Sequence, residues 1–208
     1  MRIGIIGAGN IGGTMAKIWA RKGHEIMLGI RDPLSRKHQD FAVVNNIKIG
    51  GIREAADFGG VILLAVPYGA AKGTIRKLGD IKGKVLIDCT NALNAKMDGL
   101  LLGFRTSAAE EISKASKGAR VVKAFNSLGW QNLTTLDFNG LKADAFICGD
   151  DMTAKGIVSS LAKDLGFDVV DAGGLKQARL PEPLAMLWIS MAYGEKMGTG
   201  IAFKLLKR

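Results

Sequence analysis

The chain has 208 residues, which is enough for one full hydrophobic core and a small additional lobe but not for several domains. Hydrophobic residues make up 48% of it and aromatic residues 6%, a composition that excludes a disordered chain and is typical of α/β proteins built on aliphatic side chains. The net charge of +10 comes from Lys and Arg scattered along the chain, without a basic and aromatic stripe, so we expect no nucleic-acid partner.

The first predicted elements are a strand over 2–6, a helix over 14–21 and a second strand over 25–29. Between the first strand and the helix runs the sequence Gly7-Ala8-Gly9-Asn10-Ile11-Gly12. In a dinucleotide-binding βαβ unit, glycines at these positions make the tight turn, admit a pyrophosphate and let the helix pack closely on the strand. The helix N-terminus favours the phosphates through its free N–H groups and its dipole. The alternative is a glycine turn without a ligand.

The end of the second strand indicates which dinucleotide is bound. NAD-binding chains usually have Asp or Glu there, whereas the 2′-phosphate of NADP needs a cation. This chain has Ile30 and Arg31, followed by Ser35, Arg36 and Lys37, which can surround a phosphate. We therefore expect NADP(H), although Asp32 keeps NAD as an alternative and the basic residues could simply be solvated.

Strand and helix signals continue to alternate along the chain. Strands are predicted at 47–49, 60–66, 84–88, 120–125, 143–148 and 168–171, and helices at 53–58, 70–78, 107–116, 154–165, 184–197 and 201–206. The alternation predicts an α/β fold, a Rossmann-type doubly wound parallel sheet in the order 3-2-1-4-5-6. We expect a Rossmann domain over 1–140 and a small C-terminal lobe of strands and helices over 141–208.

Ligands of such sheets bind at the carboxyl ends of the strands. Near the first and fourth strand ends we expect Ala65, Val66 and Pro67 to line the cofactor site, and Asn91 follows the fifth strand. Lys123 and Asn126, at the end of the sixth strand, are candidates for the acceptor site. The alternative role of Lys123 is an ion pair with a neighbouring acid.

The helix predicted over 184–197 carries an apolar stripe, which is either ordinary core or the seam of a homodimer. Its longest apolar run, 184–193, is too short to span a bilayer, and the first strand begins at residue 2, which leaves no room for a signal peptide. We therefore expect a cytoplasmic protein with no membrane partner.

The chain has two cysteines and two histidines, Cys89, Cys148, His24 and His38. Neither cysteine belongs to a C-x-x-C motif, so we expect reduced structural thiols. The histidines are too few for a metal site or a His-activated nucleophile, and we expect both on the surface.

Several segments resemble the F420-dependent NADP oxidoreductases, from the opening Met-Arg-Ile-Gly-Ile-Ile-Gly to Gly200-Ile-Ala-Phe-Lys-Leu205. The resemblance implies a Rossmann domain with a small C-terminal lobe, NADPH as one cofactor, and a dimer. It also implies that Ala8 to Ile11 hold the pyrophosphate, that Ile30, Arg31 and Ser35 or Arg36 hold the 2′-phosphate end, and that Val66 and Pro67 lie beside the nicotinamide.

The segment Val121-Val-Lys-Ala-Phe-Asn126, followed by Trp130, is also similar to the cytoplasmic reductase domain of the STEAP metalloreductases, which use a flavin. Members of the F420 family can have His in place of Asn126. The acceptor implied is thus F420 or a flavin such as FAD or FMN, with Trp130 as a stacking platform or as core packing.

Hydride transfer between a nicotinamide and such a ring depends on positioning and needs no side-chain base. We therefore expect an oxidoreductase that transfers a hydride between NADP(H) and a deazaflavin or flavin. One alternative is an NADPH-dependent reductase of a small imine or carbonyl compound, for which Lys123 is the proton-donor candidate. The other is a redox sensor that binds NADPH without chemistry.

Overall fold

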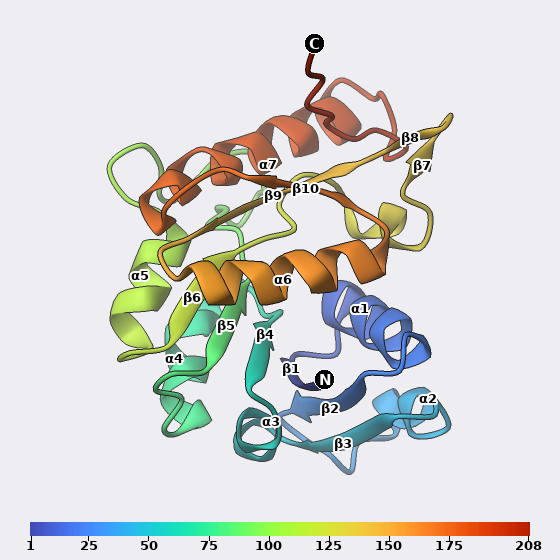
Figure 1. Cartoon of the computed structure of the whole chain (residues 1–208), viewed down its shortest axis with the longest axis vertical. Helices are drawn as coiled ribbons and strands as arrows, with labels where there is room; N and C mark the ends of the chain where they lie inside the picture. The colour runs from blue at the N-terminus through green and yellow to red at the C-terminus, as the bar shows by residue number, and fades with distance from the viewer.

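Aliphatic strands build the centre of the molecule in the computed structural model, which describes all residues, 1–208 (Figure 1). Eight strands form one sheet in the order β3-β2-β1-β4-β5-β6-β9-β10. Their bounds are β1 (Arg2–Ile6), β2 (Glu25–Ile30), β3 (Ile47–Gly51), β4 (Val61–Leu64), β5 (Val85–Asp88), β6 (Arg120–Lys123), β9 (Asp144–Gly149) and β10 (Asp168–Asp171). The predicted α/β class and the predicted order of the first six strands are confirmed.

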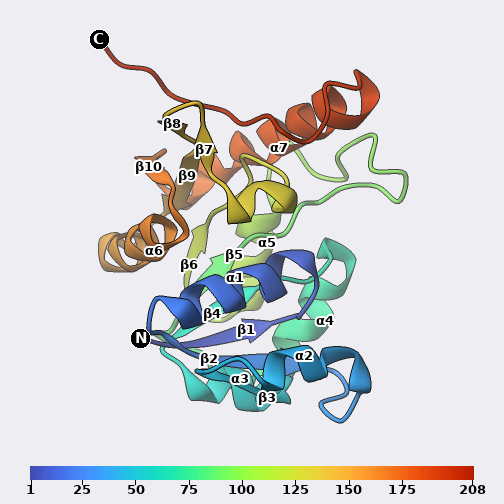
Figure 2. The same cartoon turned by 90° about the vertical axis from the view of Figure 1, so that its right-hand side faces the viewer.

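Helices cover both faces of the sheet, as Figures 1 and 2 show. One face carries α1 (Asn10–Arg21), α2 (Gln39–Ala42) and α6 (Met152–Leu165), and the other carries α3 (Ile52–Phe58), α4 (Tyr68–Leu78) and α5 (Ala108–Ala115). The last helix, α7 (Pro181–Ile189), follows β10. This is the layer arrangement of a doubly wound fold.

Two hydrophobic clusters fill the space between the sheet and its helices. Ile3 and Ile5 of β1 belong to the first cluster with Trp19 of α1, whereas Ile6 belongs to the second with Ile75 of α4. Successive strand residues point to opposite faces, so a strand buried on both faces is apolar throughout. This explains why β4 and the first three residues of β5 are continuous apolar runs without alternation.

The C-terminal part of the chain extends the same sheet but in the opposite direction. β9 pairs antiparallel with β6, and β10 then pairs parallel with β9. A short hairpin, β7 (Asp137–Phe138) and β8 (Leu141–Lys142), precedes β9. Its Asn139-Gly140 turn has positive φ at both residues, and this dipeptide is a hairpin signal that the sequence analysis missed. The division into 1–140 and 141–208, and the homodimer, stay predictions.

The helix predicted over 201–206 was wrong, because this segment has no regular secondary structure. Trp188 donates its indole N–H to the Ile201 carbonyl at 2.7 Å, and the Phe203 carbonyl accepts from the Asp144 N–H at 3.2 Å. Lys204 binds the carboxylates of Asp144 and Asp168 at 2.9 and 2.6 Å. These long-range bonds take the place of helical ones, which the local pattern could not show.

Two further helix boundaries differ from prediction. The helix predicted over 184–197 instead starts at Pro181 and ends at Ile189, and a π-helical turn over Ser190–Gly194 follows it. There Tyr193 packs edge-on against Trp188, with ring centroids 6.1 Å apart. At the other end of the chain, α1 starts at Asn10, four residues before the prediction, so the second half of the glycine motif forms its first turn.

His24 was expected on the surface, and this prediction was wrong. It is buried, its Nε2 lies 2.9 Å from the Asp164 carboxylate of α6, and its Nδ1 lies 3.0 Å from the amino group of Met1. The Gly-His-Glu turn therefore packs against the C-terminal part of the chain instead of facing solvent. None of the helices combines the length and the apolar character that crossing a membrane requires.

The bonds of Lys204 lead to a test of the extended C-terminal segment. Lys204→Met leaves the buried Asp144 carboxylate with fewer partners, so we expect the free energy of unfolding to fall by about 1–3 kcal/mol. Denaturant unfolding measures this, with Lys207→Met as control because Lys207 forms no ion pair. Equal decreases in the free energy of unfolding for the two substitutions would contradict the docking of the 201–206 segment through Lys204.

Candidate functional site

The glycine turn between β1 and α1 is a close contact of three elements. Gly7 has φ +105°, and a Cβ there would lie 2.3 Å from the Ala65 carbonyl oxygen. A Cβ on Gly12 would lie 2.0 Å from the Gly7 carbonyl oxygen. By contrast, a Cβ on Gly9 meets nothing within 4 Å. Gly7 and Gly12 are thus required by packing, whereas Gly9 keeps the open side of the turn free of side chain.

The open side of this turn faces a cleft of about 810 Å³. Of the predicted cofactor residues, those that line it are Gly7, Ala8, Gly9, Asn10, Ile30, Arg31, Ser35, Ala65, Val66 and Pro67. Ile11, Gly12, Arg36 and Asn91 do not line it. The backbone N–H groups of the first turn of α1 have no helical partners, and no side chain caps them. The cleft therefore presents free backbone N–H donors, the groups that bind anions at helix N-termini.

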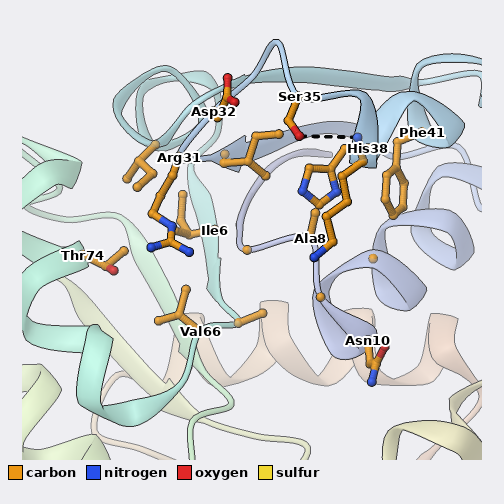
Figure 3. A pocket seen from close by; sticks show the side chains of 18 of the residues that line it. Ile6, Ala8, Asn10, Arg31, Asp32, Ser35, His38, Phe41, Val66 and Thr74 are labelled. Atoms are coloured by element: carbon orange, nitrogen blue, oxygen red, sulfur yellow. Dashed lines mark hydrogen bonds between the residues drawn. The ribbon is translucent and has the colours of Figure 1, made fainter.

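Arg31 and Asp32 follow β2 but point in different directions. Figure 3 shows the Arg31 guanidinium directed into the cleft, toward Thr74 and Val66, while the carboxylate of Asp32, which also lines the cleft, is directed away from that guanidinium. The Asp32 carboxylate accepts the Leu34 N–H at 3.2 Å and so helps to form its own loop. Neither Arg31 nor Lys37 forms an ion pair with a carboxylate of the chain. Both cations are thus available to an anion in the cleft.

Phe41, His38 and Thr74 also line the cleft, and the sequence analysis did not assign them to the site. Phe41 of α2 packs on α1, where a Cβ on Gly13 would lie 2.7 Å from its ring. Lys17 of α1 also lines the cleft, lies 4.7 Å from the centroid of that ring and binds Asp40 at 2.9 Å. That hydrogen bond holds the pKa of Asp40 below its ordinary value. The helix α2 is too short to give a periodic sequence signal, so the sequence did not reveal that Phe41 lines the cleft.

The acceptor-site candidates lie beyond the cleft, at the ends of β5 and β6. Lys123 is completely buried and binds the carboxylates of Asp88 at 3.0 Å and Glu182 at 3.3 Å. Asn126 is buried and donates to the Thr90 carbonyl at 3.1 Å and to the Asn91 side-chain oxygen. The structure thus brings Asn91, Lys123 and Asn126 into one hydrogen-bonded group. Trp130, 41% exposed, lies at the start of a 3₁₀ turn over Trp130–Thr134 and is not among these bonded residues.

Neither cysteine is suited to nucleophilic chemistry. Burial raises the pKa of the Cys89 thiol to about 12, and that of Cys148 to about 11. Both are free thiols, and Cys89 donates to the Leu64 carbonyl inside the sheet. The structure contains no group of three or more His, Cys, Asp or Glu side chains arranged to hold a metal ion. The chemistry that this site can support therefore depends on what binds in the cleft.

Comparison with known proteins agrees with this geometry. Residues 2–92, which contain the glycine turn, the Arg31 loop and the end of β5, match the model of the family described as NADP oxidoreductase, coenzyme F420-dependent. Among curated proteins, the metalloreductase STEAP3 of Rattus norvegicus is 30% identical over 189 residues, and STEAP2 of Homo sapiens is 25% identical over 192. Each alignment covers 89% of this chain, which spans only 37% of the length of either relative.

Solved structures show the same fold. A proposed F420-dependent NADP reductase from Arthrobacter sp. FB24 superposes with a TM-score of 0.91, at 28% identity and over 100% of both chains. A reductive aminase from Aspergillus terreus, solved with NADPH and ethyl levulinate, has a TM-score of 0.71 at 16% identity and shows the fold alone; the alignment covers 94% of this chain and 62% of that one. The resemblance to NADP-linked oxidoreductases expected from the sequence is confirmed.

The contacts of the glycine turn predict opposite outcomes for two neighbouring substitutions. Gly12→Ala forces α1 away from Gly7, so we expect a loss of about 1–3 kcal/mol in the free energy of unfolding. Gly9→Ala meets nothing and changes stability by less than about 1 kcal/mol. Thermal and denaturant unfolding distinguish the two, and an equally stable Gly12→Ala variant contradicts the close packing.

The buried thiols give a second test. Because protonated, desolvated thiols react slowly, we expect neither Cys89 nor Cys148 to react with a disulfide reagent in the native protein at neutral pH. Both react once the chain is unfolded in denaturant. Rapid modification of either thiol in the folded protein would contradict the buried position of that thiol.

Proposed function

We propose that this chain is an NADPH-dependent oxidoreductase that transfers a hydride between NADP(H) and a deazaflavin such as F420, or a flavin. The assignment of NADP(H) as the cofactor rests on one observation. Arg31 and Lys37, two cations without a carboxylate partner, line a cleft that begins at the uncapped N-terminus of α1. The match of residues 2–92 to an F420-dependent NADP oxidoreductase family supports the same conclusion. The activities named for the curated relatives are those of chains much longer than this one.

Three features of the cleft fit NADPH. The backbone N–H groups after Gly9 suit the pyrophosphate, since a helix N-terminus stabilises anions. Arg31 and Lys37 suit the 2′-phosphate, with the Ser35 hydroxyl beside them in the lining. Asp32, the residue that favours NAD, is directed away from Arg31 and is engaged in its own loop (Figure 3). We infer that NADPH is preferred over NADH.

Residues at the other end of the cleft would hold the nicotinamide half. When bound, NADPH supplies the hydride, and the chain's own contribution is to fix the ring and exclude water. Val66 and Pro67 offer an apolar wall after β4, and Asn91 follows the neighbouring strand β5. None of these side chains titrates, so the site is built for positioning and not for proton transfer.

The state of Lys123 supports one class of acceptor over another. A carbonyl or imine reductase needs a group that delivers a proton near the reacting atom. Lys123 is the ionisable residue at the end of β6, but it is fully buried and binds two carboxylates. Transfer between two rings needs no such donor, so a deazaflavin or flavin acceptor agrees better with the site than a small carbonyl or imine compound.

Arg31→Ala tests the cofactor assignment. Losing a charge-assisted hydrogen bond to the 2′-phosphate weakens NADPH by about 1.5–3 kcal/mol and leaves NADH nearly unchanged. Isothermal titration calorimetry with both cofactors measures the difference. Arg36→Ala is the matched control, because Arg36 is exposed and does not line the cleft. Equal losses for NADPH and NADH in Arg31→Ala overturn the role of Arg31.

The acceptor is tested by following NADPH oxidation spectroscopically with F420, FAD, FMN and no acceptor. Oxidation with F420 or with a flavin identifies the acceptor ring. If the protein binds NADPH but oxidises it only with a small imine or carbonyl compound, the proposed acceptor class is wrong. Binding of NADPH without oxidation in any mixture leaves a cofactor-binding sensor.

A further inference from the structure

Three charged side chains meet in the interior without access to water. Asp88 at the end of β5 and Lys123 at the end of β6 are 0% exposed, and Glu182 in the first turn of α7 is 1% exposed. Asp88 and Lys123 are register partners in the sheet, whereas Glu182 arrives from 59 residues further along the chain (182 − 123). Buried charges of this kind are rare unless they are paired, and they seldom improve stability over apolar side chains.

Every charge in this cluster is satisfied by a specific partner. The Asp88 carboxylate accepts from Lys123 at 3.0 Å and from the Thr90 N–H at 2.8 Å. The Glu182 carboxylate accepts the N–H groups of Ala108 and Ala109, at 2.8 and 3.1 Å, at the start of α5. The helix N-terminus thereby balances the second negative charge. The three residues form one cluster with a formal charge of −1.

The Lys123 ammonium is held by three partners. It donates to the Asp88 carboxylate and to the Thr90 carbonyl oxygen, and the Glu182 carboxylate lies 3.3 Å away as an ion-pair partner. Burial alone disfavours the charged form, but Asp88 and then Glu182 outweigh it, so the pKa of Lys123 lies above its ordinary value. Lys123 is therefore a fixed charge at neutral pH and acts only through what it holds.

What Lys123 holds is the turn after β5. The Thr90 carbonyl accepts from Lys123 and also from Asn126, and Asn126 donates its second N–H to Asn91. Leu64, Asp88 and Lys123 occupy matching positions on β4, β5 and β6. The turn containing Thr90 and Asn91 is thus the neighbour, along the same sheet edge, of the Val66 and Pro67 wall of the cleft.

Two buried oxygens at this turn have no partner, the Thr90 hydroxyl and the Asn126 side-chain carbonyl. Buried polar atoms in native proteins nearly always have a hydrogen-bond partner, so each unpaired atom requires an explanation. Neither Thr90 nor Asn126 lines the cleft, so these oxygens mark the turn itself as incompletely hydrogen-bonded and offer no direct contact to a ligand.

We propose that Lys123 is a positioning residue, which holds the Thr90 carbonyl and, through Asn126, sets Asn91 for the nicotinamide end of NADPH. The proposal rests on the proposed function, because it requires NADPH in the cleft. Glu182 of α7 connects the C-terminal part of the chain to the same cluster. Its carboxylate pairs with the Lys123 ammonium and accepts the Ala108 N–H at the start of α5. Lys123 needs no contact with the cofactor for this role.

The test compares two ligands that differ only at the nicotinamide end. NADPH and 2′-phospho-ADP-ribose, which lacks the nicotinamide, are titrated by calorimetry into the wild type and Lys123→Met. We expect the dissociation constant of NADPH to rise about tenfold and that of the fragment to change by less than about twofold. The fluorescence of bound NADPH is expected to shift toward that of the free cofactor, which reports the ring environment without turnover.

A second variant controls for destabilisation of the fold by an unpaired buried charge. Lys123→Met combined with Glu182→Gln removes one charge of each sign, so the cluster keeps its formal charge of −1. We expect the same difference between the two ligands in this double variant. Glu182→Gln alone, which keeps the bond from Lys123 to Thr90, and Lys155→Met, which breaks the ion pair of the buried Lys155 with the half-exposed Asp171, lower stability without that difference.

The outcomes separate the two proposals. If the wild type binds neither ligand, the NADPH function fails. If the wild type binds both and the two Lys123 variants bind both unchanged, with unchanged fluorescence, NADPH binding stands and the positioning role is overturned. The positioning role is equally overturned if Lys155→Met shows the same preference between the ligands, because that effect reflects general destabilisation.

Discussion

The cleft depends on one close contact, the meeting of the glycine turn with the ends of β1 and β4. No room remains for a side chain at Gly7 or Gly12, because a Cβ at either would overlap a backbone carbonyl oxygen at 2.3 or 2.0 Å. This contact seats the first turn of α1 on the strand ends and leaves its N–H groups facing the cleft. Arg31, at the end of the adjacent β2, then lies opposite Val66 across the same opening (Figure 3). A methyl group added at Gly7 or Gly12 would displace α1 and with it the N–H groups that face the cleft.

The basic residues of this chain serve distinct purposes that their number alone does not show. Arg31 and Lys37 have no carboxylate partner and face the cleft, whereas Lys17 is neutralised by Asp40 and covers the Phe41 ring. Lys123 is buried and orders a turn of the backbone. The net charge of +10 therefore says little about the site. What matters is which cations lack a partner, and only the folded arrangement reveals that.

The sheet order and the glycine turn could be predicted because each depends on a local pattern: apolar runs separated by helices, and glycines at fixed spacing. Arg31 was found in the same way, from its place after β2. The pattern could not separate Arg31 from Arg36, since a turn of 3₁₀ helix over Arg36–His38 decides which side chain reaches the cleft. It also could not place Phe41 and Thr74 in the wall, or show that Glu182 meets Lys123. The extended 201–206 segment was mistaken for a helix for the same reason, because its hydrogen bonds join residues distant in the sequence.

The reversal of direction between β6 and β9 has a consequence for how this fold can change. Because β9 and β10 run against β6, their carboxyl ends and the loops after them lie at the edge of the sheet opposite the cleft. From this part of the chain, the edge where β5 and β6 end is reached by the stretch before β9, which includes the small β7–β8 hairpin, and by α7, whose Glu182 binds Lys123. A change in either segment would thus alter the chain around the ends of β5 and β6 without altering the packing of Gly7 and Gly12 or the position of Arg31. The glycine-turn end of the cleft and the segments around the ends of β5 and β6 can therefore vary independently of each other.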